Sequence, residues 1–257
     1  MTCRMAVIAL NTFRESIREK LLYIVLIYAG ILLLCTFVLS PLSVGAARGK
    51  IITDVGLAGI SLLGVITVIV VGSSLVHKEI EKKAVLMIVT RPVSRQEYLV
   101  GKFAGVVMAL GLLMLAMAVV MSAMILWGDG RVNVPVLSAV YLSMLEMAVI
   151  SAVVIFFSTF TTPVLTSFFA VCVFVAGSLS GDLRAFASKF GGPAVRHLTE
   201  FFYYVLPNIK VFNLRNEAVH DLRFNGADIA LATLYAAAYC AVVLYLAYLI
   251  FRRREFS

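Results

Sequence analysis

The chain has 257 residues, of which 62% are hydrophobic and only 14% are charged, and its mean hydropathy is +1.01. Soluble domains carry about 25% charged residues, so a water-soluble fold is excluded. Inside lipid, only helices or closed barrels satisfy the hydrogen bonds of the backbone. Barrel strands alternate apolar and polar residues over about ten positions, whereas the apolar runs here are continuous and much longer. The composition therefore predicts an all-α integral membrane protein.

The first predicted element is an amphipathic helix at residues 4–20. Ala6, Leu10, Phe13 and Ile17 recur on one helical face, and charged residues lie off that face. A helix of this kind is expected to lie at the membrane interface and to lead into the first membrane span.

Six apolar segments are long enough to cross a bilayer, which takes about 20 residues in a helix. They are 21–40, 55–76, 103–127, 136–157, 164–180 and 229–251. An even number of spans places both termini on one side of the membrane. Lys and Arg are concentrated on that side, so both termini are predicted to be cytoplasmic. The net charge of +8 is explained by this topology and by contact with lipid headgroups, and no nucleic-acid partner is predicted.

Two segments between the spans are predicted to have structure of their own. Residues 77–92 form a short cytoplasmic helix that Pro92 ends, and Ser94 with Glu97 makes a capping box at the start of the third span. Residues 181–228 form an outer loop whose apolar run, 201–206, is too short to span and is typical of a re-entrant or interfacial turn.

The cytoplasmic segment resembles the corresponding loop of ABC-2 type permeases, the membrane subunits of type-2 ABC exporters. The shared pattern is Glu79-x-Glu81, an apolar stretch, Pro92-Val-Ser-Arg95, and Gly101-Lys102 at the opening of the third span. Many family members carry Gly-Thr where this chain has Lys83-Ala84. The chain also resembles the permeases for multicopper-enzyme maturation, including the copper-processing permease that accompanies nitrous oxide reductase.

The resemblance implies six spans, an N-terminal elbow helix at 4–20, an outer re-entrant segment, and a place in the cytoplasmic (inner) membrane of a bacterium or archaeon. It also implies a dimer, with a second copy or a related permease, bound to ATPase subunits through a coupling helix at 77–92. The residues expected to contact the ATPase are Lys78, Glu79, Glu81, Lys82, Lys83, Arg91, Pro92, Ser94 and Arg95.

The chain is not expected to be an enzyme. A P-loop needs G-x-x-x-x-G-K-[ST], and Gly101-Lys102 lacks both the upstream glycine and the following hydroxyl residue. ATP and Mg²⁺ are therefore expected on the partner ATPase, and no cofactor on this chain. No metal site is predicted either, because the cysteines and histidines are isolated from one another.

Candidate residues for the translocation path or a permease interface lie inside the spans. Glu146 sits near the middle of the fourth span, where a carboxylate is costly and faces a cavity or a partner; a structural role is the alternative. Met114, Met117, Met121 and Met124 recur on one face of the third span, a pattern that suits Cu(I) transfer but favours ordinary packing. Two other functions remain open: an ATP-independent channel or secondary transporter, and an intramembrane enzyme that uses Glu146.

Overall fold

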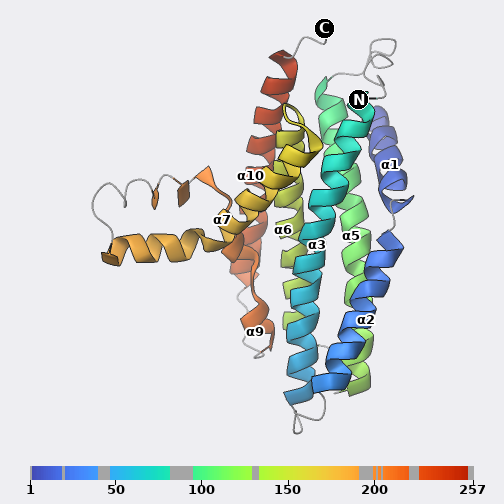
Figure 1. Cartoon of the computed structure of the whole chain (residues 1–257), viewed down its shortest axis with the longest axis vertical. Helices are drawn as coiled ribbons and strands as arrows, with labels where there is room; N and C mark the ends of the chain where they lie inside the picture. Colours follow the sequence, from blue (N-terminus) through green and yellow to red (C-terminus); the bar gives the residue numbers. More distant parts are fainter. Residues whose placement is uncertain are drawn as a thin grey trace.

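Figure 1 shows the computed structural model of the chain, a bundle of long helices. The structure describes residues 2–18, 21–39, 47–81, 95–128, 133–190, 199–200, 202–203, 205–219 and 226–253. No strand occurs within these ranges. The helices are α1 (Thr2–Arg18), α2 (Leu21–Leu39), α3 (Ala47–Glu81), α5 (Arg95–Gly128), α6 (Val134–Ser158), α7 (Pro163–Phe190), the 3₁₀ helix η2 (Ile209–Phe212), α9 (Arg215–Val219) and α10 (Gly226–Arg253).

Five helices in the described part are long and apolar enough to cross a membrane. Their apolar stretches are Gly49–Ser73, Gln96–Trp127, Val134–Ser158, Pro163–Ala187 and Gly226–Arg252. The described apolar stretch of α2, Tyr23–Val38, is shorter. The all-α membrane architecture is therefore confirmed, and a sixth span at α2 stays a prediction.

The centre of the bundle is α3, which packs against α2, α5, α6 and α7. Two glycines let its neighbours approach closely. A Cβ atom on Gly56 would lie 2.5 Å from the sulfur of Met121, and one on Gly64 would lie 3.0 Å from the terminal methyl of Met114. Small residues are the usual means of close helix contact in lipid, where apolar surface alone does not drive helices together.

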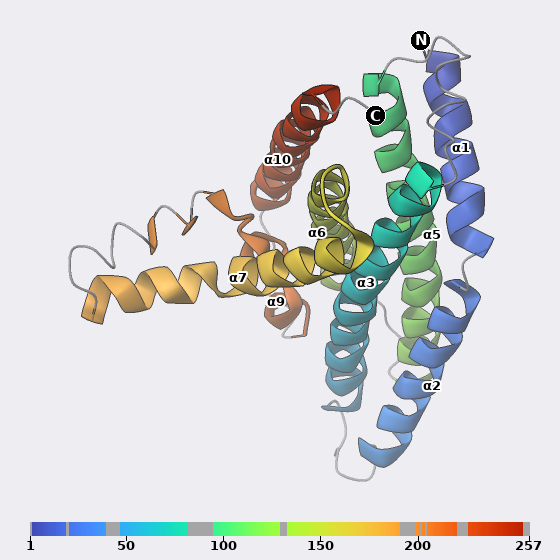
Figure 2. The same ribbon diagram turned by 45° about the horizontal axis from the view of Figure 1, so that its top comes forward.

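Helix α1 packs lengthwise against the first half of α5, as both views show (Figures 1 and 2). Its buried side chains are the small residues Ala9, Thr12 and Ser16. Val7 and Leu10 are exposed, at 63% and 47%, whereas the partly buried Phe13 packs against the core. A helix is present where the sequence predicts one, and its position at the membrane interface stays a prediction.

Both α3 and α5 are longer than a bilayer requires. At 1.5 Å per residue their 35 and 34 residues extend about 52 and 51 Å, against roughly 30 Å of hydrocarbon. The last turns of α3 and the first turns of α5 lie at the end of the bundle where α1 begins and α10 ends (Figure 1). Residues 77–81 of the predicted coupling helix continue α3 without a break, and 82–94 lie outside the described residues.

A short turn at 159–162 joins the fourth and fifth predicted spans, and in it the amide of Thr161 donates to the carbonyl of Phe157 at 3.0 Å. Helix α7 then continues to Phe190, ten residues past the predicted end of the span, and its second half leaves the bundle (Figures 1 and 2).

The chain then returns to the bundle, and η2 packs against α6 and α7. A Cβ atom on Gly177 of α7 would lie 2.5 Å from the carbonyl oxygen of Pro207. The amide of Asn208 donates to the hydroxyl of Tyr235 on α10 at 2.8 Å. Part of the predicted outer loop is thus built into the core, with Phe212 only 1% exposed.

Candidate functional site

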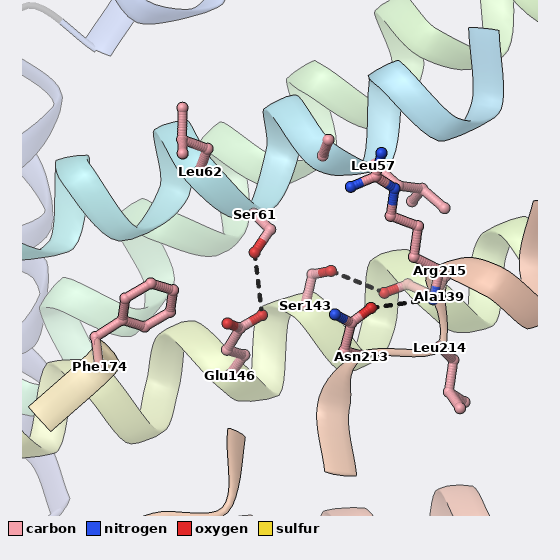
Figure 3. Close-up of a pocket in the computed structure, with 11 residues that line it drawn as sticks. Leu57, Ser61, Leu62, Ala139, Ser143, Glu146, Phe174, Asn213, Leu214 and Arg215 are labelled. Carbon is pink, nitrogen blue, oxygen red and sulfur yellow. Dashed lines mark hydrogen bonds between the residues drawn. The ribbon is translucent and has the colours of Figure 1, made fainter. Parts of the chain in front are cut away.

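A pocket of about 250 Å³ opens between α3, α6, α7 and the segment that leads into α9 (Figure 3). Four parts of the chain that are distant in sequence form its walls. The lining residues are Leu57, Ala58, Ser61 and Leu62 of α3; Ala139, Ser143 and Glu146 of α6; Phe174 of α7; and Asn213, Leu214 and Arg215.

Glu146 is the acidic group of the pocket. It lies at the centre of α6, its residue is only 5% exposed, and its side chain points toward α3 (Figure 3). The hydroxyl of Ser61 donates to its Oε2 at 3.4 Å, longer than the 2.5–3.0 Å of a normal O–H···O bond. Among the described residues, no cation forms an ion pair with this carboxylate.

Arg215 also lines the pocket, but its charge is directed to Asp54. Its guanidinium donates two hydrogen bonds to that carboxylate, one of them from Nη2 to Oδ2 at 2.8 Å. This bidentate pair joins the start of α9 to the first part of α3, and both side chains are about 40% exposed. Arg215 is thus neutralised by Asp54 rather than by Glu146.

The other polar lining groups are held by backbone bonds. The hydroxyl of Ser143 donates to the carbonyl of Ala139 at 3.0 Å, and the side-chain oxygen of Asn213 accepts the amide of Arg215 at 3.3 Å. Both hydroxyls of the pocket, those of Ser61 and Ser143, keep lone pairs that can accept a hydrogen bond from a ligand.

The four methionines of the third predicted span lie apart from this pocket. Met114, Met117 and Met121 are at most 1% exposed and belong to the core shared by α3, α5 and α6, against which the partly buried Met124 also packs. None of the four lines the pocket. Their role in a translocation path or an interface remains a prediction.

Of the predicted ATPase-contact residues, four fall within the described helices. Lys78, Glu79 and Glu81 lie in the last turn of α3, and Arg95 opens α5. The other five, Lys82, Lys83, Arg91, Pro92 and Ser94, lie outside the described residues.

Sequence reasoning missed Ser61, Asp54 and Arg215 as site residues. Ser61 is a single hydroxyl in an apolar helix, and nothing in the sequence indicates which side chain it faces. Asp54 and Arg215 are 161 positions apart, so their pairing follows only from the return of the chain after α7.

A comparison with protein-family models decides the identity of the chain. The sequence model described as ABC-2 family transporter protein matches residues 6–256. The chain belongs to this family. An ABC-2 protein with several membrane-crossing helices is the permease subunit of an ABC transporter, so the inference from the coupling-loop motif is confirmed.

The family assignment supports transport rather than catalysis, and it gives no support to a channel, a secondary transporter or an intramembrane enzyme. A search of curated proteins returned no match to this ABC-2 permease. Its predicted similarity to copper-processing permeases stays a prediction.

Proposed function

We propose that this ABC-2 permease is one of two permease subunits of an exporter, coupled through residues 77–95 to separate subunits that bind ATP and Mg²⁺. Family membership supports association with an ABC ATPase and with the bilayer. In this proposal the chain has six spans. The 19 residues of α2 extend about 28 Å, close to the roughly 30 Å of hydrocarbon, so this helix completes the set.

The observation that carries the proposal is the continuity of α3. This one helix bears Ser61 of the pocket and Glu79 of the predicted ATPase contact, about 27 Å apart at 1.5 Å per residue. A displacement of its charged end by an ATPase subunit would be transmitted along the helix to the pocket wall, because a continuous helix moves as a rigid element.

The second permease is proposed to lie against apolar faces that the single chain leaves uncovered. Helix α2 has one of them, with Leu34 65% and Phe37 83% exposed. The substrate path would run between the two permeases. The excess of Lys and Arg near residues 77–102 supports a cytoplasmic position for this end, in the inner membrane of a prokaryote.

The proposal is tested by co-purification from mild-detergent extracts of the native host. The test variant carries Glu79→Ala, Glu81→Ala and Arg91→Ala. Its control carries Asp182→Ala, Glu200→Ala and Lys210→Ala, which likewise removes two acids and one base, but within the predicted outer loop 181–228.

An ABC ATPase is expected to co-purify with the wild type and with the control variant, and to be lost or strongly reduced with the test variant. Equal recovery of the ATPase with all three proteins would show that residues 77–95 are not the contact. No nucleotide-binding partner with any of them would contradict the exporter assignment.

A further inference from the structure

The pocket at Glu146 holds an acid without a matching cation. The carboxylate is buried at the centre of a membrane-crossing helix, and its described hydrogen bond, from Ser61, is long. A charge in this position is costly unless a partner compensates it. Arg215 is the one cationic residue among the described residues that line the pocket, and its guanidinium already donates two hydrogen bonds to Asp54.

The size and lining of the pocket indicate what the missing partner is. A volume of about 250 Å³ is several times the roughly 30 Å³ that one water molecule occupies in the liquid, so it exceeds the need of a bare ion. Na⁺ or Ca²⁺ would require about six oxygen ligands, whereas the described lining offers one carboxylate, two hydroxyls and one amide. Soft metals prefer sulfur or imidazole, and neither group occurs among the lining residues in the part of the chain that the structure describes.

The remaining walls are apolar. Leu57, Leu62 and Leu214 line the pocket together with the aromatic ring of Phe174, which reaches it from α7 on the same side as Glu146 (Figure 3). Ligand sites of this kind combine an apolar lining with a few polar groups that fix orientation. The arrangement matches a molecule with one charged group and an apolar body.

We propose that this pocket binds a small organic monocation, an alkyl- or arylammonium, and that such cations are the substrate class of the permease. The ammonium group takes the place beside Glu146, where it donates to the carboxylate and to the hydroxyls of Ser61 and Ser143. The apolar body contacts Leu62 and Phe174. The pairing of Arg215 with Asp54 removes the repulsion that a free guanidinium would exert on such a ligand.

This inference rests on the proposed function for the transport step, but the binding step is tested alone. The full-length chain is reconstituted in lipid nanodiscs, with any ATPase subunit that co-purifies and without nucleotide. Binding of 2-phenylethylamine is measured by calorimetry and compared with that of 2-phenylethanol, which replaces the ammonium group by a hydroxyl. Failure to bind would leave the ATPase contact standing, and loss of the ATPase contact would leave the binding result standing.

Three variants test separately the charge of Glu146, the free volume of the pocket and the effect of a substitution outside the pocket. Glu146→Gln keeps the shape and removes the charge, and it is expected to weaken binding of the amine by roughly tenfold or more, because a hydrogen bond to a charged group is lost. Ala58→Leu fills the pocket and leaves Glu146 in place, and it is expected to weaken binding as strongly. Asp182→Asn removes an acid whose side chain is 68% exposed outside the pocket, and it is expected to leave binding unchanged.

Preferential binding of the amine that is lost in both pocket variants and kept in Asp182→Asn supports the proposal. Equal binding of amine and alcohol would show an apolar cavity without charge selection and would overturn it. Undiminished binding in Glu146→Gln or in Ala58→Leu, or no binding to the wild type in either sodium or potassium buffer, would overturn it as well.

Discussion

The contact between α1 and α5 allows a quantitative test of the packing. A Cβ atom on Gly105 would lie 2.6 Å from the carbonyl oxygen of Ala9 and 2.6 Å from the Cβ atom of Thr12. Neither atom can move by a change of side-chain rotamer, so Gly105→Ala must push α1 away from α5. Overpacking of this kind costs about 1–3 kcal/mol.

The matched control is Gly30→Ala in α2, where a Cβ atom would have nothing within 4 Å. Both substitutions replace a glycine inside a helix and gain up to about 1 kcal/mol of helix propensity, so the comparison cancels that gain. At roughly 2–4 °C per kcal/mol for chains of 150–250 residues, the apparent melting temperature of Gly105→Ala should lie roughly 2–12 °C below that of Gly30→Ala.

The assay is the thermal unfolding of both variants in the same detergent at one heating rate, followed by intrinsic fluorescence and by loss of the monodisperse peak. Cysteine pairs between α1 and α5 would report whether α1 has moved. Equal melting temperatures for the two variants would refute the packing of α1 on α5.

Two further contacts give predictions of their own. Gly56→Ala should be destabilising because its new methyl group meets the sulfur of Met121, and Met121→Ala should relieve part of that cost. The double-mutant cycle is expected to give an interaction energy of about 0.5–3 kcal/mol between the two positions. Additive effects of the two substitutions on stability would contradict the contact. Asp54→Asn and Arg215→Gln should each change the free energy of unfolding by only about 1 kcal/mol, since both side chains are about 40% exposed. Each substitution should nevertheless raise the rate of amide hydrogen exchange in α9. Both the loss of stability and the rise in exchange should be smaller in high salt, which already screens the ion pair. Exchange in α9 that is unchanged in both variants would contradict its attachment to α3.

Apolar runs located the membrane-crossing helices well because hydropathy is the property that a bilayer selects. Their ends were located less well. The second span was predicted to begin at Val55, whereas α3 begins at Ala47 and includes Arg48, Lys50 and Asp54. A helix continues through polar residues once it has left the hydrocarbon, and hydropathy does not register that continuation.

The helix at α1 was predicted from the spacing of its apolar residues, but its contact with α5 was not. Ala9, Thr12 and Ser16 are buried, and Gly105 of α5 lies against Ala9 and Thr12. In lipid an apolar surface gains little by leaving its solvent, whereas small side chains let two helices approach closely. The apolar pattern of a helix therefore does not indicate which of its residues meet a neighbouring helix.

Glu146 was identified from the sequence because a single acid within a long apolar run is conspicuous. Its surroundings were not accessible in the same way. Ser61 and Phe174 belong to other helices, and the ion pair at Arg215 depends on a chain reversal that no local pattern specifies.

The attachment of α9 to α3 also sets an order of assembly during synthesis. Asp54 enters the membrane region with α3, and Arg215 follows 161 residues later. At about 5–20 residues per second, a ribosome takes roughly 8–32 s to add that length of chain. During this interval the first helices are already inserted, but the wall of the pocket formed by residues 213–215 does not yet exist. The pocket is completed only after most of the protein has been made, so a truncated chain that ends before Arg215 inserts helices without forming the site.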